Sequence, residues 1–245
     1  MSLFKKKSKI KFKKFESSIE ASEYVAIEVL NEVKKGKKIN LGLATGSTPI
    51  LLYNALVSDY EETRTPWKNV STYNLDEYLN LPEGHPQTYK EFMKKHLFSH
   101  IDINLDNTHF PKVNENYDSL IQLNGGIDIQ ILGIGTNGHI GFNEPGSLLK
   151  SITRVVDLTQ ETIDVNAKQF FAGNKDLVPK QAISMGLESI LNAKKIYLLA
   201  FGYSKNEAME KLYHAEKFDV NFPASALLQH NDVTVVFDNG TELDI

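Results

Sequence analysis

The sequence predicts an α/β fold, a doubly wound and mostly parallel β-sheet with helices on both faces and a small lid element. Segments with helical periodicity alternate with short apolar runs along most of the chain, which is the pattern of parallel strands joined by helices. The run Lys195–Phe201 has the length and the continuous apolar character of a strand buried on both faces. At 245 residues, 41% of them hydrophobic, the chain is long enough to bury a full core. We therefore expect residues 1–245 to form a single domain.

Composition excludes several classes of protein. The chain contains no cysteine, which excludes a disulfide framework, thiolate catalysis and thiolate metal sites. Its apolar runs are all shorter than the roughly 18 residues that a membrane span needs. Because the sequence also shows no signal-peptide pattern, we expect a cytoplasmic protein with no membrane partner.

Basic charge is concentrated in residues 1–14, which carry seven lysines and no acid. Such a run can form an arm that binds nucleic acid or an anionic membrane. The whole chain has a net charge of −4, so its remainder is strongly acidic and a poor match for a polyanion. We therefore interpret the run as a solvated terminus that leads into an edge strand near Ile10, and we expect no nucleic-acid partner.

The first elements lead to a loop that is suited to an anion. A packing helix over about residues 17–36 is followed by a buried strand at Ile39–Ala44 and by the loop 45–49. We expect Thr48 to be the N-cap of the next helix and Pro49 to be its first residue. Free backbone N–H groups at such a helix start bind anions, although an ordinary strand-to-helix turn is the alternative. The loop lacks the Gly-Lys-Ser/Thr of a nucleotide P-loop, which favours a small phosphate over a nucleoside triphosphate.

An acidic pair, Asp76 and Glu77, follows the next predicted strand, Val70–Leu75. Ligands of parallel α/β sheets bind beyond the carboxyl ends of the strands, so this pair faces the same crevice as the phosphate loop. Adjacent side chains point in different directions, so at most one of the two carboxylates enters the crevice. Solvated charge or helix capping is the alternative role for either residue.

Helices are expected next at Gln87–Ser99 and at about Asn114–Leu123. The histidines of this part of the chain show no regular ligand spacing and have neither cysteines nor paired acids beside them. We therefore expect surface residues rather than a metal site.

The stretch Ile127–Pro145 is the one around which the site is organised. An apolar run ends there in closely spaced glycines and is followed at once by polar residues, the pattern of a strand that delivers functional groups into a tight turn; these polar residues are Asn137, His139 and Glu144. The glycines also fit the Gly-x-Gly-x-x-Gly of a dinucleotide-binding turn. That turn opens a helix, whereas Pro145 forbids a regular helix here, so we do not expect a nicotinamide cofactor.

The segment beyond Pro145 is a candidate lid, over about residues 150–182. Arg154–Leu158 looks extended and Thr159–Phe171 helical, and both lie between the site and the next core element at Ile183–Leu191. After the strand Lys195–Phe201, a capping box of Ser-x-x-Glu type at 204–207 should begin a helix whose first turn contains Lys205. A helix dipole disfavours a cation there unless an anion is bound. A short helix near Ala224–Leu228 and a strand at Val233–Phe237 close the chain.

Four motifs, LGLATGSTP, YNLDEY, GIGTNGHIGFNEPG and FGYSK, together resemble the glucosamine-6-phosphate deaminases. The likeness spans about residues 39–237. It implies a Rossmann-like sheet with a lid and hydrolytic isomerisation of a small-molecule sugar phosphate, glucosamine 6-phosphate, to fructose 6-phosphate and ammonia. It also implies no metal and no organic cofactor.

Matched by position, the resemblance assigns a role to each candidate residue. Asp76 takes the place of the base that moves the C2 proton, His139 that of the acid/base of ring opening, and Asn137 and Glu144 those of the residues that orient the histidine. Some members carry Asp at the place of Asn137. The phosphate cradle would consist of Gly46, Ser47, Thr48 and Lys205, with Lys168 at a place where many members have arginine.

Two other functions remain open, and the resemblance also bears on regulation. A 6-phosphogluconolactonase shares the fold and the Gly-x-Gly-x-x-Gly-His turn but is not expected to combine Asp-Glu-Tyr with Gly-Phe-Asn-Glu-Pro. A non-catalytic sugar-phosphate-sensing protein usually adds a DNA-binding segment. Members activated by N-acetylglucosamine 6-phosphate use a Ser and an Arg-x-Lys set, which Ser147 and Arg154 match but Val156 does not. We therefore expect a monomer or small homo-oligomer without this activation.

Overall fold

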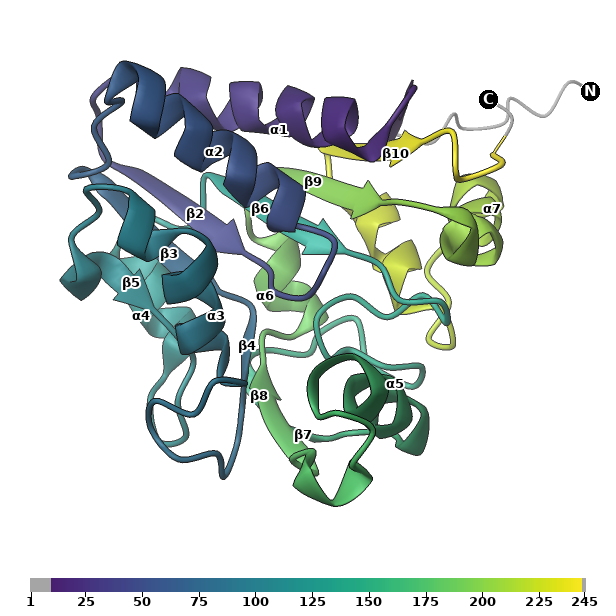
Figure 1. Cartoon of the computed structure of the whole chain (residues 1–245). Coiled ribbons are helices and arrows are strands. Elements are labelled where there is room, and N and C mark those ends of the chain that lie inside the picture. The colour runs from purple at the N-terminus through teal and green to yellow at the C-terminus, as the bar shows by residue number, and fades with distance from the viewer. Residues whose placement is uncertain (1–9, 244–245) are drawn as a thin grey trace, which may run out of the picture.

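A parallel β-sheet forms the centre of the computed structural model, which describes residues 10–243 (Figure 1). All of its strand pairs are parallel, so the predicted doubly wound α/β class is confirmed. The predicted edge strand near Ile10 is also present, whereas most of the lysine run lies outside the described residues. Across the sheet the order of strands is β1 (Lys11–Phe15), β10 (Val233–Asp238), β9 (Lys195–Ala200), β6 (Ile129–Gly133), β2 (Ile39–Leu43), β3 (Val70–Asn74) and β5 (Thr108–His109).

Helices pack against both faces of this sheet. Side chains alternate between the faces along each strand, so that Ile131 packs on one side and Leu132 on the other. Burial on both faces explains why these strands read as continuous apolar runs. One face is covered by α1 (Ser18–Val33), α2 (Ile50–Thr63) and α3 (Tyr89–His96), and the other by α4 (Tyr117–Leu123), α6 (Leu187–Leu191), α7 (Asn206–His214) and the 3₁₀ segment η5 (Pro223–Gln229) (Figure 1).

Polar caps set several helix boundaries. Ser17 caps α1, because its side chain accepts a hydrogen bond from the N–H of Glu20. Two helices begin later than predicted: α3 because Thr88 is its N-cap, and α4 because Asn116 is. Short 3₁₀ turns complete this part of the chain, η1 (Phe98–His100) and η2 (Leu105–Asn107).

Two predicted caps are wrong, and both lie in loops that line the site. The N-cap of α2 is Pro49 in helical conformation rather than Thr48, because the preceding residues already turn. The Ser204 capping box does not form either, since Ser204 lies inside a 3₁₀ turn, η4 (Tyr203–Lys205), which makes Lys205 the N-cap of α7. A residue within such a turn cannot adopt the extended backbone that a capping side chain needs.

A small antiparallel sheet and the helix α5 lie beside the carboxyl ends of the central strands (Figure 1). The sheet consists of β4 (Asp76–Tyr78), β8 (Gln181–Ser184) and β7 (Arg154–Asp157). Between β7 and β8 the chain forms α5 (Gln160–Phe170) and the 3₁₀ turn η3 (Lys175–Leu177). A separate hydrophobic cluster that includes Tyr78, Phe142 and Phe171 packs α5 onto this sheet. The predicted extended segment and the helix that follows it are therefore present at 154–170. Within residues 10–243, every helix is too short or too polar to cross a bilayer.

The connections of the central sheet open a crevice between β2 and β6. After β2 the chain continues to β3 and β5 on one side, whereas β6 leads to β9 and β10 on the other. Loops that follow neighbouring strands and diverge in this way leave room for a ligand at the carboxyl edge. The loops after β2 and β6 are the two that the sequence analysis singled out.

Candidate active site

A cavity of about 420 Å³ lies at this crevice. The loop after β2, the start of β4, the turn after β6, the pocket side of α5 and the turn η4 all line it. These segments bring together residues as far apart in the sequence as Ala44 and Lys205. Seven of the nine predicted site residues line the cavity: Gly46, Ser47, Thr48, Asp76, Asn137, His139 and Lys205.

Two glycines of the turn after β6 make space for aromatic rings rather than for a dinucleotide. A Cβ atom on Gly135 would lie 2.1 Å from Cε1 of His139, so only glycine allows the imidazole to pack on this backbone. Gly138 has a positive φ of 83°, and a Cβ there would lie 2.1 Å from the ring of Phe222. The chain then continues in a tight turn closed by a bridge between Ile140 and Asn143, in place of the helix that a dinucleotide-binding turn would begin.

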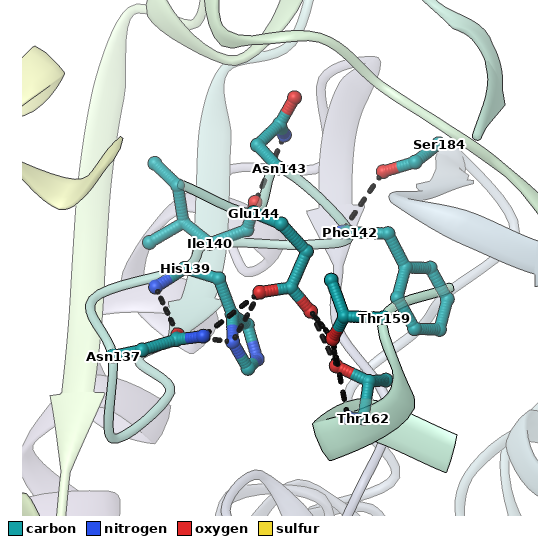
Figure 2. A network of polar contacts seen from close by, with 9 residues as sticks. All are labelled: Asn137, His139, Ile140, Phe142, Asn143, Glu144, Thr159, Thr162 and Ser184. Atoms are coloured by element: carbon teal, nitrogen blue, oxygen red, sulfur yellow. Dashed lines mark hydrogen bonds and ion pairs between the residues drawn. The ribbon is translucent and has the colours of Figure 1, made fainter. Parts of the chain in front are cut away.

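Asn137 fixes the tautomer of His139 (Figure 2). Its side-chain Oδ1 accepts the backbone N–H of His139 at 3.1 Å, and its Nδ2 donates to Oε2 of Glu144 at 2.9 Å. These two partners determine which end of the amide is the oxygen. The same Oδ1 lies 2.7 Å from Nδ1 of His139, so Nδ1 carries the hydrogen. Nε2 is thereby the ring nitrogen with a free lone pair.

Glu144 lies behind the histidine and outside the cavity lining, with 8% of its surface exposed. Oε2 is 3.6 Å from Nδ1 of His139, close enough to stabilise a protonated ring. Oε1 accepts a hydrogen bond from the hydroxyl of Thr162, and Oγ1 of Thr159 lies 3.4 Å from the same oxygen (Figure 2). Both carboxylate oxygens are therefore hydrogen-bonded, one to the turn and the other to the lid helix.

The surroundings of His139 favour the neutral imidazole. Burial lowers the pKa of His139, and the positive charge of Lys205 acts in the same direction. Glu144 and Glu161 oppose this by stabilising the imidazolium. A ring that is neutral near physiological pH, with a carboxylate nearby to stabilise its cation, can both accept and return a proton.

Asp76, at the start of β4, lines the same cavity and is a candidate for proton transfer. Burial raises its pKa to about 8, and the negative charge of Glu77 contributes in the same direction. Among the described residues, no donor forms a hydrogen bond to the Asp76 carboxylate that would offset this burial. Gly141 of the turn after β6 lies near this carboxylate, and a Cβ there would make an ordinary contact of 3.5 Å with Oδ2 of Asp76.

Glu77 faces away from the cavity and caps a helix. Its Oε1 accepts the backbone N–H groups of Tyr78 and Tyr89, and its Oε2 accepts that of Lys90. The carboxylate thus lies at the start of α3, where the helix dipole favours a negative charge. The expectation that at most one of the adjacent acids enters the crevice is confirmed, and the capping role falls to Glu77.

The loop after β2 and Lys205 both line the cavity. Gly46 has a positive φ of 91°, a conformation that glycine adopts without strain and that turns the loop over the cavity. Burial lowers the pKa of Lys205, because a buried ammonium loses hydration. Within residues 10–243, the ion pairs do not include Lys205. A bound anion would supply the counter-charge.

Lys168 is not brought to the cavity with the other candidates. It is exposed on α5, and the cavity is lined instead by its neighbour Gln169. The pocket side of α5 carries Thr162, Asn166 and Gln169, at the spacing of three to four residues that one helix face requires. Lys168 is one position, or about 100° of rotation, away from that face.

Several cavity residues were not anticipated from the sequence. Tyr78 and Tyr89 pack against each other beside Asp76, and the Oη of Tyr78 accepts a hydrogen bond from Asn166 at 2.7 Å. The available signal was the three-to-four spacing of polar residues on the predicted lid helix, which shows a face but does not show what that face covers. In the described part of the chain, no group of three or more His, Asp and Glu side chains is arranged to hold a metal ion.

The chain is similar in sequence to a known protein family and to several of its members. Residues 14–236 match the family model described as glucosamine-6-phosphate isomerases/6-phosphogluconolactonase. Glucosamine-6-phosphate deaminase of Malacoplasma penetrans is 46% identical over 238 residues, which cover 93% of this chain and 98% of the relative. Glucosamine-6-phosphate deaminase 2 of Bacillus subtilis is 47% identical over 219 residues, which cover 86% and 87% of the two chains.

The fold is also similar to solved structures, one with clear sequence identity and one with much lower identity. A structure described as a monomeric glucosamine-6-phosphate deaminase superposes with a TM-score of 0.89 at 39% identity, covering 94% of this chain and 98% of that one. The 6-phosphogluconolactonase from Trypanosoma cruzi superposes with a TM-score of 0.73 at 19% identity, covering 97% of both chains. The second likeness shows a shared fold alone.

Proposed function

The chain belongs to the family of glucosamine-6-phosphate isomerases and 6-phosphogluconolactonases, and from this premise we propose that it is a glucosamine-6-phosphate deaminase. The reaction converts glucosamine 6-phosphate and water to fructose 6-phosphate and ammonia. One observation carries the proposal: a single cavity holds an imidazole and a carboxylate suited to proton transfer, and it is also lined by the loop after β2 and by Lys205.

His139 opens the sugar ring. Ring opening needs a proton taken from the anomeric hydroxyl and a proton returned to the ring oxygen, and one imidazole can do both in turn. The hydrogen bond from Nδ1 to Asn137 leaves Nε2 to face the substrate. Glu144 stabilises the imidazolium that forms between the two transfers.

Asp76 moves a proton from C2 of the open-chain sugar to C1. A proton also passes from the amine to the C1 oxygen, so the aldehyde becomes a hydroxymethyl group and the C2–N bond becomes an imine. Water adds to that imine, and ammonia leaves to give the C2 ketone. A base at C2 must be a carboxylate whose pKa has risen toward the working pH, and burial raises the pKa of Asp76 to about 8. Asp76 lies on β4 and His139 in the turn after β6, so the two groups approach different atoms of the sugar.

The 6-phosphate binds at the loop Gly46-Ser47-Thr48 and at Lys205. Backbone N–H groups and a lysine are the usual ligands of a small phosphate. Binding energy from this remote group holds the reacting carbons in place during both proton transfers.

A 6-phosphogluconolactonase is the alternative within the same family. Its reaction is hydrolysis of a lactone, which needs no base at C2 of the substrate, so a buried carboxylate with a raised pKa beside the cavity favours the deaminase. The relatives at 46–47% identity are deaminases, whereas the lactonase structure of Trypanosoma cruzi is 19% identical. A non-catalytic sugar-phosphate-sensing protein would not need either proton-transfer group.

The state and place in which the enzyme works are also proposals. The similar structure at 39% identity is described as monomeric, which supports a monomer or small homo-oligomer. A small sugar phosphate as the sole partner and metabolic relatives support a cytoplasmic location.

The test is an ammonia assay on the purified protein. Glucosamine 6-phosphate should release ammonia and yield fructose 6-phosphate in equal amounts, and 6-phosphogluconolactone should not be hydrolysed above the background rate. Lactone hydrolysis without ammonia release would select the alternative, and inactivity on both compounds would favour the sensing protein.

A further inference from the structure

The carboxylate of Glu144 links the catalytic turn to the first turn of α5 (Figure 2). On the turn side, Oε2 accepts the amide of Asn137 at 2.9 Å. On the helix side, Oε1 accepts the hydroxyl of Thr162, which is only 8% exposed. We propose that Thr162 is a positioning residue whose hydroxyl fixes the Glu144 carboxylate and, through it, the orientation of His139.

The hydrogen positions of the two threonines follow from their partners. Thr159 is the N-cap of α5, and its Oγ1 accepts the backbone N–H of Thr162 at 3.2 Å. The hydroxyl of Thr159 donates to Oγ1 of Thr162 at 3.0 Å. Thr162 therefore has its single hydroxyl hydrogen left for Oε1 of Glu144, and an ionised carboxylate can only accept. Head-to-tail hydrogen bonds of this kind polarise and strengthen one another.

This chain of hydrogen bonds makes the lid helix part of the catalytic apparatus. It starts at a backbone N–H in the first turn of α5 and ends at the carboxylate that faces the imidazole. If that turn of α5 unfolds or moves away, Oε1 loses its donor and Glu144 is free to rotate away from Asn137. The inference rests on the proposed function, because it assigns a purpose to the alignment of His139 in ring opening.

Thr162 also lines the cavity, so direct contact with substrate is the competing explanation. The two explanations differ in how the substitutions combine. A residue that acts through Glu144 has little further effect once Glu144 is altered, whereas a substrate contact would add its own loss. They also differ in the kinetic constant affected, because a binding contact changes KM and a positioning contact changes kcat.

The experiment compares Thr162→Val, which keeps the shape and removes the hydroxyl, with the matched control Thr162→Ser, which keeps the hydroxyl. Misalignment of a catalytic group should lower kcat by about tenfold or more in the valine variant. KM should stay within about twofold, and the serine variant should retain most of the wild-type kcat. In a Glu144→Gln background, Thr162→Val should cost little more. Wild-type kcat in the valine variant, or a fully additive loss in the double variant, overturns the inference.

An NMR titration of the His139 imidazole provides a readout that does not depend on turnover. The charged groups that face this ring are Glu144, Lys205 and Glu161. Glu144 raises the pKa of His139, so loss of its alignment in Thr162→Val should lower that pKa, whereas Thr162→Ser should leave it as in the wild type. An unchanged pKa in a folded valine variant contradicts the inference.

The proposed function and the positioning role of Thr162 can be rejected independently of each other. Absence of ammonia release by the wild type would reject the proposed function, and the titration would still decide whether Thr162 positions Glu144. If circular dichroism shows that Thr162→Val does not fold, Thr162→Ala replaces it. Alanine also lacks the hydroxyl, and it is smaller than threonine, so it cannot crowd the cluster around α5.

Discussion

Oδ1 of Asn137 accepts both the backbone N–H and the ring Nδ1–H of His139, at 3.1 and 2.7 Å. One amide therefore fixes the position of the turn and the tautomer of the imidazole together. Because this oxygen is neutral, the negative charge near the ring comes from Glu144 and, with a smaller effect, from Glu161. The geometry allows each role of the site to be tested by a separate substitution.

The first prediction concerns the tautomer of His139. Asn137→Leu removes the acceptor for Nδ1–H and should lower kcat by about 10² or more, because the ring can then present the wrong nitrogen. Asn137→Asp keeps an acceptor for both N–H groups of His139 and should retain more activity. Steady-state kinetics at one pH measures both variants. Equal activity of the leucine variant and the wild type would show that Asn137 does not orient the ring.

The second prediction concerns the charge next to the base. Glu77 contributes to the raised pKa of Asp76, so Glu77→Gln should lower that pKa. The base must be ionised to act, and the acidic limb of the kcat/KM profile should therefore move to lower pH in this variant. The glutamine carbonyl can still accept the N–H groups of Tyr78 and Tyr89, whereas the N–H of Lys90 loses its acceptor, so a thermal melt should accompany the profile to show that the variant is folded. A shift to higher pH would contradict the assignment.

The third prediction separates two lysines. Lys205→Ala should raise KM for glucosamine 6-phosphate about tenfold or more, because it removes a charge-assisted bond worth roughly 1.5–3 kcal/mol. Lys168→Ala serves as the control, since this lysine is exposed and outside the cavity, and it should change KM by less than about threefold. Non-phosphorylated glucosamine should be a very poor substrate of the wild type. If Lys168→Ala raised KM more than Lys205→Ala did, the phosphate would instead bind at the outer side of α5.

The fourth prediction is that N-acetylglucosamine 6-phosphate does not activate the enzyme. Arg154, which could serve in an effector site, is engaged within the fold by Oδ1 of Asn143 at 3.0 Å and Oγ of Ser147 at 3.4 Å. Val156 stands where a lysine would be expected for such a site. An effector acts only through differential affinity for two states, so we expect hyperbolic kinetics that the compound leaves unchanged. A sigmoidal substrate curve that becomes hyperbolic on its addition would show that the site exists.

The longer strands could be predicted from the sequence, whereas the shortest strands could not. Strands buried on both faces, such as β9 and β10, can be recognised in the sequence as apolar runs. Their predicted bounds differ from those in the structure by one residue. The three residues of β4 and the four of β8 are too few to show a period. The caps at Thr48 and Ser204 failed because the backbone there is set by turns and by packing from outside the motif.

The candidate site was predictable where function concentrates residues in one motif. His139, Asn137 and Glu144 lie within eight residues, and the structure joins them by direct contacts. Thr162 and Gln169 belong to the site through the docking of α5 on the small sheet, a tertiary arrangement that the order of residues in the helix does not encode. The exposed position of Lys168 has the same cause, since the packing of α5 decides which residues face the cavity.

The central claim is that Asp76 moves the C2 proton, and the variant Asp76→Asn tests it. Burial raises the pKa of Asp76 from 3.8 to about 8, so the folded wild type loses stability as pH rises through that window. The asparagine variant lacks this loss. It should match the wild type near pH 4 and should melt at least about 2 °C higher at pH 9, which shows that it is folded.

The decisive measurement is ammonia release from glucosamine 6-phosphate by Asp76→Asn and wild type at equal concentrations. We predict that kcat of the variant falls by about 10² or more while KM changes little, because a base at the reacting carbon is lost and the phosphate contacts remain. Near-wild-type ammonia release by the folded variant would contradict the account.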